Sequence, residues 1–290
     1  MRALNQVPWP ETQDDFRAIV DRHEPVVFRR AALDWPCTQR WTSAYLRERL
    51  GEKQVTATRA PSRRYRPDPK QGHYAPTDMQ KMSFGEFLDR TCDPDPNPDD
   101  PSYYLHRQNL EQHLPELRDD VVVPPYVDGS SLLLVSLWMG PAGSVTPIHH
   151  DFTDNLFVQV QGKKRVILYE PDPDAAFYRL PFRSGNGRSS WHVSRVGSAD
   201  SVDIETHPLF QQARAFEALM DPGDILFIPN FYWHEVHSLD SPSISLSYWW
   251  DQRSLSETEA AIAKVTDFVA FYDQQPAVWR SLIDGILRNR

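Results

Sequence analysis

Short apolar runs separated by glycine and proline dominate the second half of this 290-residue chain. They are Leu132–Met139, Asn155–Val160, Arg165–Tyr169, Ile225–Ile228 and Ile244–Trp250. Runs of this length suit strands better than helices, and turn residues between them are typical of β-sandwiches and β-barrels. We therefore predict a mainly β core over residues 126–253, built as a sandwich or a closed barrel.

The N-terminal segment, residues 1–125, has a mixed pattern. Phe16–His23 has amphipathic helical spacing, Pro25–Phe28 is a strand candidate, and Trp41–Leu50 again has helical spacing. Such alternation predicts a mixed α/β lead-in that packs on the core rather than a linker.

The C-terminal segment, residues 254–290, has helical signals. Ser256 and Glu259 have the spacing of a capping box ahead of an amphipathic run, and Pro276 separates this run from a second one. Two helices cannot enclose a core alone, so we expect this pair to pack on the barrel or on a second copy. We predict a homodimer formed through this segment.

Composition limits the classes of function. With only Cys37 and Cys92, a disulfide framework and a four-cysteine zinc module are excluded. The absence of an apolar export signal and of a run near the roughly 20 residues that cross a bilayer predicts a soluble, cytoplasmic protein with no membrane partner. A net charge of −9 disfavours nonspecific nucleic-acid binding, although Arg59–Lys70 concentrates basic residues locally.

Two histidines and one carboxylate are the candidate metal ligands. His149 and Asp151 are two residues apart, so on a strand both would project to the same face while His150 points away. His234 follows the block Pro222–Pro229 and supplies the third ligand, whereas His237 has the wrong parity to share its face. Two imidazoles and one carboxylate with open positions are the ligand set of non-haem Fe(II) oxygenases.

An oxygenase of this kind needs two further electrons per dioxygen, which 2-oxoglutarate supplies while chelating the iron. The distal carboxylate of 2-oxoglutarate requires a buried cation. Lys164, at the start of the run Arg165–Tyr169, lies at a suitable distance from the strand predicted to carry the metal ligands. The alternative is that Lys163, Lys164 and Arg165 are ordinary turn residues.

The combined pattern resembles a known family. Thr146-Pro-x-His149-x-Asp151-x3-Asn155-x6-Gly162-x-Lys164 is similar to the JmjC-type, cupin-like 2-oxoglutarate oxygenases. This family includes the asparaginyl hydroxylase that acts on hypoxia-inducible factor and the tRNA wybutosine hydroxylase. Segments of the latter resemble Cys37–Leu46 and Tyr103–Leu105.

The resemblance implies a fold and a set of roles. The fold is a double-stranded β-helix, or jelly roll. His149, Asp151 and His234 would bind Fe(II), and Lys164 would bind the distal carboxylate of 2-oxoglutarate. Thr146 and Tyr104 would assist Lys164, and Asn155 would lie near the chelating carboxylate. Ser247 stands where relatives often carry a second asparagine, so the contact at that position differs.

These observations favour a hydroxylase that acts on a protein side chain with 2-oxoglutarate and dioxygen. An RNA-modifying hydroxylase is the main enzymatic alternative, motivated by the tRNA hydroxylase resemblance and by Arg59–Lys70. A demethylase of methylated lysine is favoured less. A metal-free cupin that binds a partner without catalysis is the alternative from another class, and retention of all three ligands and Lys164 argues against it.

Overall fold

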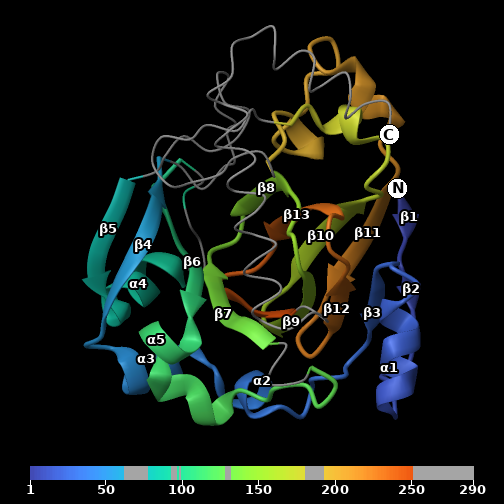
Figure 1. Cartoon of the computed structure of the whole chain (residues 1–290). Coiled ribbons are helices and arrows are strands. Elements are labelled where there is room, and N and C mark those ends of the chain that lie inside the picture. Colours follow the sequence, from blue (N-terminus) through green and yellow to red (C-terminus); the bar gives the residue numbers. More distant parts are fainter. Residues whose placement is uncertain (62–77, 93–96, 98, 128–131, 180–192, 251–290) are drawn as a thin grey trace, which may run out of the picture.

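Two antiparallel layers of four strands form the centre of the molecule (Figure 1). The computed structural model describes residues 1–61, 78–92, 97, 99–127, 132–179 and 193–250. The first layer has the order β12 (Ile225–Ile228), β9 (Asp154–Gln161), β14 (Ser243–Trp250) and β7 (Leu132–Gly140). The second has the order β11 (Ala215–Met220), β10 (Lys164–Tyr169), β13 (Trp233–Ser238) and β8 (Val145–His149). The predicted mainly β, jelly-roll-like core is confirmed.

Strands from the N-terminal segment extend both layers. β3 (Val26–Phe28) pairs with β12, and β2 (Asn5–Gln6) runs parallel to β3. At the other edge β6 (Ser102–Asn109) pairs with β7 and is followed by β4 (Gln54–Ala60) and β5 (Asp78–Ser83). β1 (Arg2–Ala3) runs parallel to β11. The strand predicted at Pro25–Phe28 is β3.

Short helices cover the outside of the sheets. They are α1 (Gln13–Val20), α2 (Pro36–Arg40), α3 (Ser43–Leu50), α4 (Phe84–Thr91) and α5 (Leu110–His113), with 3-10 turns η1 (Pro115–Asp120), η2 (Asp174–Phe177), η3 (Ala199–Ser201) and η4 (Pro208–Gln212). α1 begins at a capping box in which Thr12 and Asp15 satisfy each other's backbone N–H groups. Its buried residues are Phe16 and Val20, as its amphipathic spacing predicts.

Some predictions concern segments that the structure does not describe. The C-terminal helical pair and most of Arg59–Lys70 lie outside the described residues. The homodimer, the cytoplasmic location and the division at residues 125 and 253 therefore stay predictions. None of the helices in the described ranges is long and apolar enough to cross a membrane.

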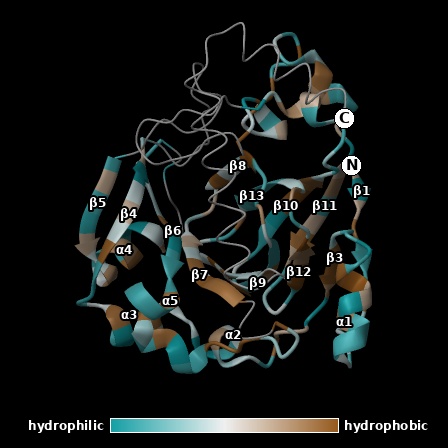
Figure 2. Ribbon diagram, viewed as in Figure 1, coloured by the Kyte–Doolittle hydropathy of each residue, from teal (hydrophilic) through white to brown (hydrophobic). Residues whose placement is uncertain are grey.

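Strand alternation decides which side chains face the space between the layers. On β10, Val166 and Leu168 belong to a core cluster that also contains Phe157 of β9 and Leu226 of β12, so they lie between the layers. Ile167 belongs to a second cluster on the outer side of the small layer. Figure 2 shows β7 and β12 largely in brown, the hydrophobic end of the scale. Lys164 shares the parity of Val166 and therefore faces inward, whereas Arg165 lies outside, where it pairs with Glu217 and Asp200.

Candidate metal centre and its cavity

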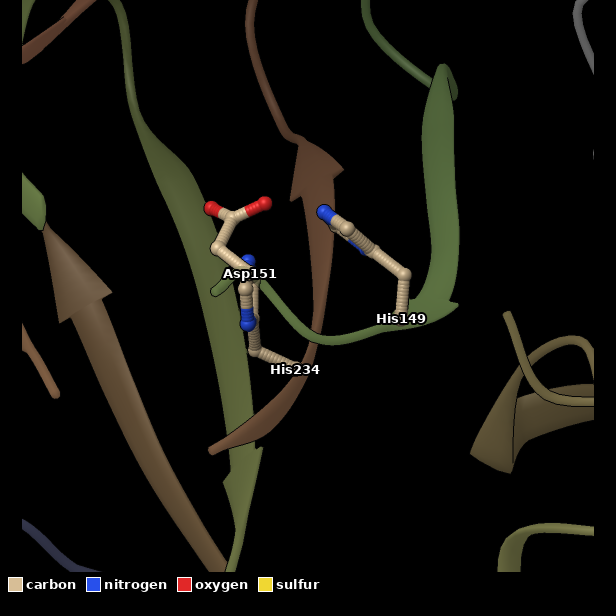
Figure 3. Close-up of side chains that lie close together, drawn as sticks. All are labelled: His149, Asp151 and His234. Atoms are coloured by element: carbon tan, nitrogen blue, oxygen red, sulfur yellow. The ribbon is translucent and has the colours of Figure 1, made fainter. Parts of the chain in front are cut away.

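The three predicted metal ligands meet between β8 and β13. His149 and His234 are direct partners across this strand pair. One ligand atom from each of His149, Asp151 and His234 lies within 4.8 Å of the others. Figure 3 shows the carboxylate and the two imidazoles turned toward one another. Among the described residues they form the one group of at least three histidine, cysteine or acidic side chains close enough to hold a metal ion.

The local backbone departs from the regular strand that the sequence predicted. β8 ends at His149, so Asp151 lies in the following loop and not on a shared strand face. The loop is fixed by the backbone N–H of Phe231, which donates to the Asp151 carbonyl at 2.8 Å. Within β8 a register shift lies opposite His234 and Val236, and this bulge turns both Thr146 and His149 into the cavity.

The ligand histidines are oriented by the backbone. The Nδ1 atoms of His149 and His234 lie 2.8 Å and 2.9 Å from the carbonyls of Pro147 and Tyr232. When Nδ1–H donates to a carbonyl, the tautomer leaves the Nε2 lone pair available for a metal. Burial, then the neighbouring His149, lowers the pKa of His234 to about 4. His234 is therefore neutral near pH 7, the form that binds a metal.

His150 and His237 lie outside the metal group, as predicted, although His150 follows the end of β8 and strand parity does not apply to it. His150 is buried outside the triad, where its ring contacts Trp233 edge-on and its Nε2 lies 2.9 Å from an Arg179 nitrogen. His237 pairs with buried Glu235 at 3.0 Å. Neither belongs to the metal group.

A cavity next to the triad contains every site residue that the sequence predicted. The space that it offers to the centres of water-sized molecules is about 30 Å³. The predicted metal ligands His149, Asp151 and His234 line the cavity. The predicted co-substrate residues also line it: Tyr104, Thr146, Asn155, Lys164 and Ser247. The remaining lining side chains are largely apolar: Trp138, Phe157, Ile228, Val236 and Trp249. The structure thus places the predicted residues together, while the individual roles implied by the resemblance stay predictions.

Lys164 is a buried cation without a counter-charge among the described residues. Its Nζ donates to the Ser245 hydroxyl at 2.6 Å and lies 5.4 Å from the centre of the Phe157 ring. Burial lowers the pKa of Lys164 to about 7. The pKa of nearby His106 falls to about 4, first through burial and then through the charge of Lys164. A buried ammonium of this kind is costly unless an anion joins it.

The remaining predicted co-substrate residues lie around Lys164 and the triad. Asn155, Ser247 and Tyr104 are buried, and Thr146 is half-buried. The side-chain oxygen of Asn155 has no hydrogen-bond partner within the described structure. It lies in the same cavity as Lys164, where it can accept a hydrogen bond from a donor.

Two contacts escaped the sequence reasoning. Ser245 is the hydroxyl that accepts from Lys164, and Trp249 donates its indole N–H to Asp151 Oδ2 at 2.9 Å. Ser245, Ser247 and Trp249 share one face of β14, so strand alternation from the predicted Ser247 points to these residues but not to their contacts with Lys164 and Asp151.

This donor set fits a divalent transition metal and a small dicarboxylate. Two neutral imidazoles and one carboxylate on one side of a metal leave positions for further ligands. Lys164 and the Asn155 oxygen lie in the same cavity and offer polar contacts to whatever occupies it. Such an arrangement can bind a metal ion that keeps positions open for further ligands.

Comparison with known proteins gives the family. The model of the cupin-like domain matches residues 12–256. This chain belongs to the cupin-like domain family. It is 30% identical over 239 residues to the lysine-specific demethylase JMJ30 of Arabidopsis thaliana, covering 81% of this chain and 51% of the relative. It is 28% identical over 257 residues to the Jumonji C domain-containing protein 5 of Drosophila melanogaster, covering 86% and 60%.

A third relative has a different named role. The chain is 29% identical over 248 residues to the tRNA wybutosine-synthesizing protein 5 of Danio rerio, covering 81% of this chain and 71% of the relative. The family resemblance predicted from the motifs is therefore confirmed. The cupin-like chain spans about half the length of the demethylase relatives.

Proposed function

We propose that this cupin-like protein is an Fe(II)- and 2-oxoglutarate-dependent oxygenase that hydroxylates a side chain of a protein substrate. The observation that carries the proposal is the position of Lys164, a buried amine with no ion-pair partner among the described residues, in the same cavity as His149, Asp151 and His234. A metal triad alone fits many reactions. A triad beside a buried ammonium favours a ligand that chelates the metal at one end and carries an anion at the other.

Each group has a definite task in this proposal. His149, Asp151 and His234 hold the iron, which when bound activates dioxygen as 2-oxoglutarate is oxidatively decarboxylated to succinate and carbon dioxide. Lys164 binds the distal carboxylate, while Ser245 holds its ammonium in place through the 2.6 Å hydrogen bond. Thr146, Tyr104, Asn155 and Ser247 complete the polar wall. The apolar side chains of Phe157, Ile228 and Val236 exclude water from the reacting centre.

Calorimetric binding of 2-oxoglutarate to the Mn(II)-loaded protein without oxygen tests the site before any substrate is known. We expect Lys164→Ala and Asp151→Ala each to weaken binding by about tenfold or more. Lys163→Ala is the matched control, because Lys163 is an exposed neighbour that pairs with Asp221 on the surface. Absence of binding to the wild-type protein would contradict the co-substrate assignment.

An RNA substrate is the second candidate. The observation that favours it is the relative named a tRNA wybutosine-synthesizing protein, of which the alignment covers 71%, more than the 51% covered in the Arabidopsis demethylase. The net charge of −9 argues for the protein substrate instead. Salt-sensitive retardation of tRNA by the purified chain would favour RNA, and unchanged tRNA mobility at low salt would leave the protein substrate.

A demethylase and a metal-free binding protein are the remaining alternatives. Relatives named lysine-specific demethylases motivate the former, and removal of a methyl group from lysine peptides would be its readout. A metal-free binding protein would need neither the metal triad nor Lys164. If metal and 2-oxoglutarate bind as expected, the non-catalytic alternative loses its basis.

A further inference from the structure

The carboxylate of Asp151 has a contact that differs in kind from those of the ligand histidines. Both imidazoles rest on backbone carbonyls, whereas Asp151 Oδ2 accepts a side-chain hydrogen bond from the indole N–H of Trp249 at 2.9 Å. Asp151 lies in the loop after β8, where its backbone carbonyl accepts from Phe231 and its carboxylate accepts from Trp249. Because Trp249 lies on a sheet strand, its N–H is a rigidly placed hydrogen-bond donor for this carboxylate.

The indole is itself held from both sides. In β14, Trp249 is paired with Asn155 of β9 and with Leu134 of β7, so its backbone lies in the middle of the large sheet. The guanidinium of Arg107 lies over the indole at 5.4 Å from its centre. Arg107 has a φ of +45° at an irregularity of β6, a backbone conformation that aims its side chain differently from its neighbours.

We propose that Trp249 is a positioning residue for the metal site, whose N–H holds one oxygen of the Asp151 carboxylate so that the other faces the two imidazoles. The inference rests on the proposed function, because it takes the triad to be a metal site. Without the N–H the carboxylate loses the indole contact that sets which of its oxygens faces the imidazoles. Outer contacts of this kind contribute about 10- to 100-fold to metal affinity.

The cavity provides a matched control. Trp138 of β7 lies 6.1 Å from Trp249 between ring centres and lines the same cavity. Its indole N–H has no hydrogen-bond partner within the described residues. Trp138→Phe therefore removes the same group from the same wall without removing a contact to a metal ligand.

Titration with Co(II) tests the inference, because both the affinity and the visible absorption spectrum report the ligand arrangement. For Trp249→Phe we expect metal affinity about tenfold below wild type and an altered spectrum. Trp138→Phe should retain the wild-type spectrum and an affinity within about twofold of wild type. In an Asp151→Ala background, Trp249→Phe should have no further effect on affinity, since the group that it positions is gone.

A structural role of Trp249 predicts a different pattern, in which Trp249→Phe weakens metal binding equally in the presence and absence of Asp151. That result, or an unchanged Trp249→Phe, overturns the inference. If Trp249→Phe fails to fold, benzothienylalanine at position 249 keeps the ring shape and replaces only the N–H, and the same two outcomes apply. If wild type binds no Co(II), or Asp151→Ala binds it as well as wild type does, the metal site itself is refuted.

Discussion

At the scale of single residues, Lys164 links the geometry of the cavity to a pH dependence. Burial lowers its pKa to about 7, so near pH 8 most empty sites contain a neutral amine, and near pH 6 most contain an ammonium. A dicarboxylate binds the ammonium. Binding of 2-oxoglutarate should therefore be accompanied by uptake of close to one proton per site near pH 8 and of much less than one near pH 6. The affinity for 2-oxoglutarate should fall as pH rises through 7.

Calorimetry in buffers of different ionisation enthalpy measures this proton uptake. Lys164→Arg is the control, because a guanidinium stays charged at both pH values and should bind without uptake. His106 should not contribute, since a pKa of about 4 leaves it neutral throughout. Equal proton uptake by wild type and Lys164→Arg would show that another group takes the proton.

The sequence predicted the residues that belong to a motif. It did not predict contacts that depend on how the strands pair. The spacing of His149, Asp151 and His234 was sufficient to predict that they meet. The contacts of Ser245 and Trp249 depend on which face of β14 meets Lys164 and Asp151 in space. That pairing involves residues 81 and 98 positions apart, which no local pattern encodes.

At the scale of elements, Gly140 at the end of β7 makes room for Tyr104 of β6. A Cβ atom at position 140 would lie 2.0 Å from Cδ2 of the Tyr104 ring. We expect Gly140→Ala to displace this ring from the cavity wall, to lower the free energy of unfolding by about 2 kcal/mol and to weaken 2-oxoglutarate binding. Denaturant unfolding and ligand calorimetry measure the two effects.

A double-mutant cycle isolates that contact. In a Tyr104→Ala background the added methyl group meets no ring, so Gly140→Ala should then cost little further stability. An equal cost in both backgrounds would place the strain elsewhere in β7. Because Tyr104 also lines the cavity, displacement of its ring links the packing of β6 against β7 to ligand binding.

Strand positions were easier to predict than strand irregularities. The apolar runs identified β7, β9, β10, β12 and β14, because each is rich in apolar residues and bounded by turn residues. β11 and β13 were missed, since polar side chains such as Glu217 and Glu235 interrupt their apolar pattern. The bulge in β8 was also missed, because it arises from pairing with β13 rather than from its own residues.

At the scale of the whole molecule, the N-terminal segment is part of the architecture around the site. β6 contributes Tyr104 to the cavity, and β3 pairs with β12. One core cluster extends from Phe16 of α1 to Trp250 of β14. The sequence predicted a packed lead-in, but it contained no signal for which strands would join which edge, because edge pairing is set by the assembled sheets.

The N-terminal elements are joined at Asp120, which lies at the end of η1. This buried carboxylate accepts hydrogen bonds from Tyr45 at 2.6 Å and from Trp41 and Arg40 at 3.0 Å each. Burial by itself would raise the pKa of Asp120, but these hydrogen bonds lower it below its ordinary value of 3.8. Because the folded pKa is depressed, the stability contributed by Asp120 is present above that ordinary value and is lost as pH falls through the folded pKa.

Asp120→Ala should therefore lower the free energy of unfolding near neutral pH by about 3 kcal/mol, because it leaves the buried Trp41 N–H and the Tyr45 hydroxyl without this acceptor. Asp119→Ala, at the exposed neighbouring position, should change it by less than about 0.5 kcal/mol. Denaturant unfolding from neutral to acid pH measures both effects. The gap between wild type and Asp120→Ala should narrow toward acid pH, where the wild-type carboxylate becomes protonated. A gap that stays constant with pH would mean that Asp120 stabilises the fold through packing and not through its charge.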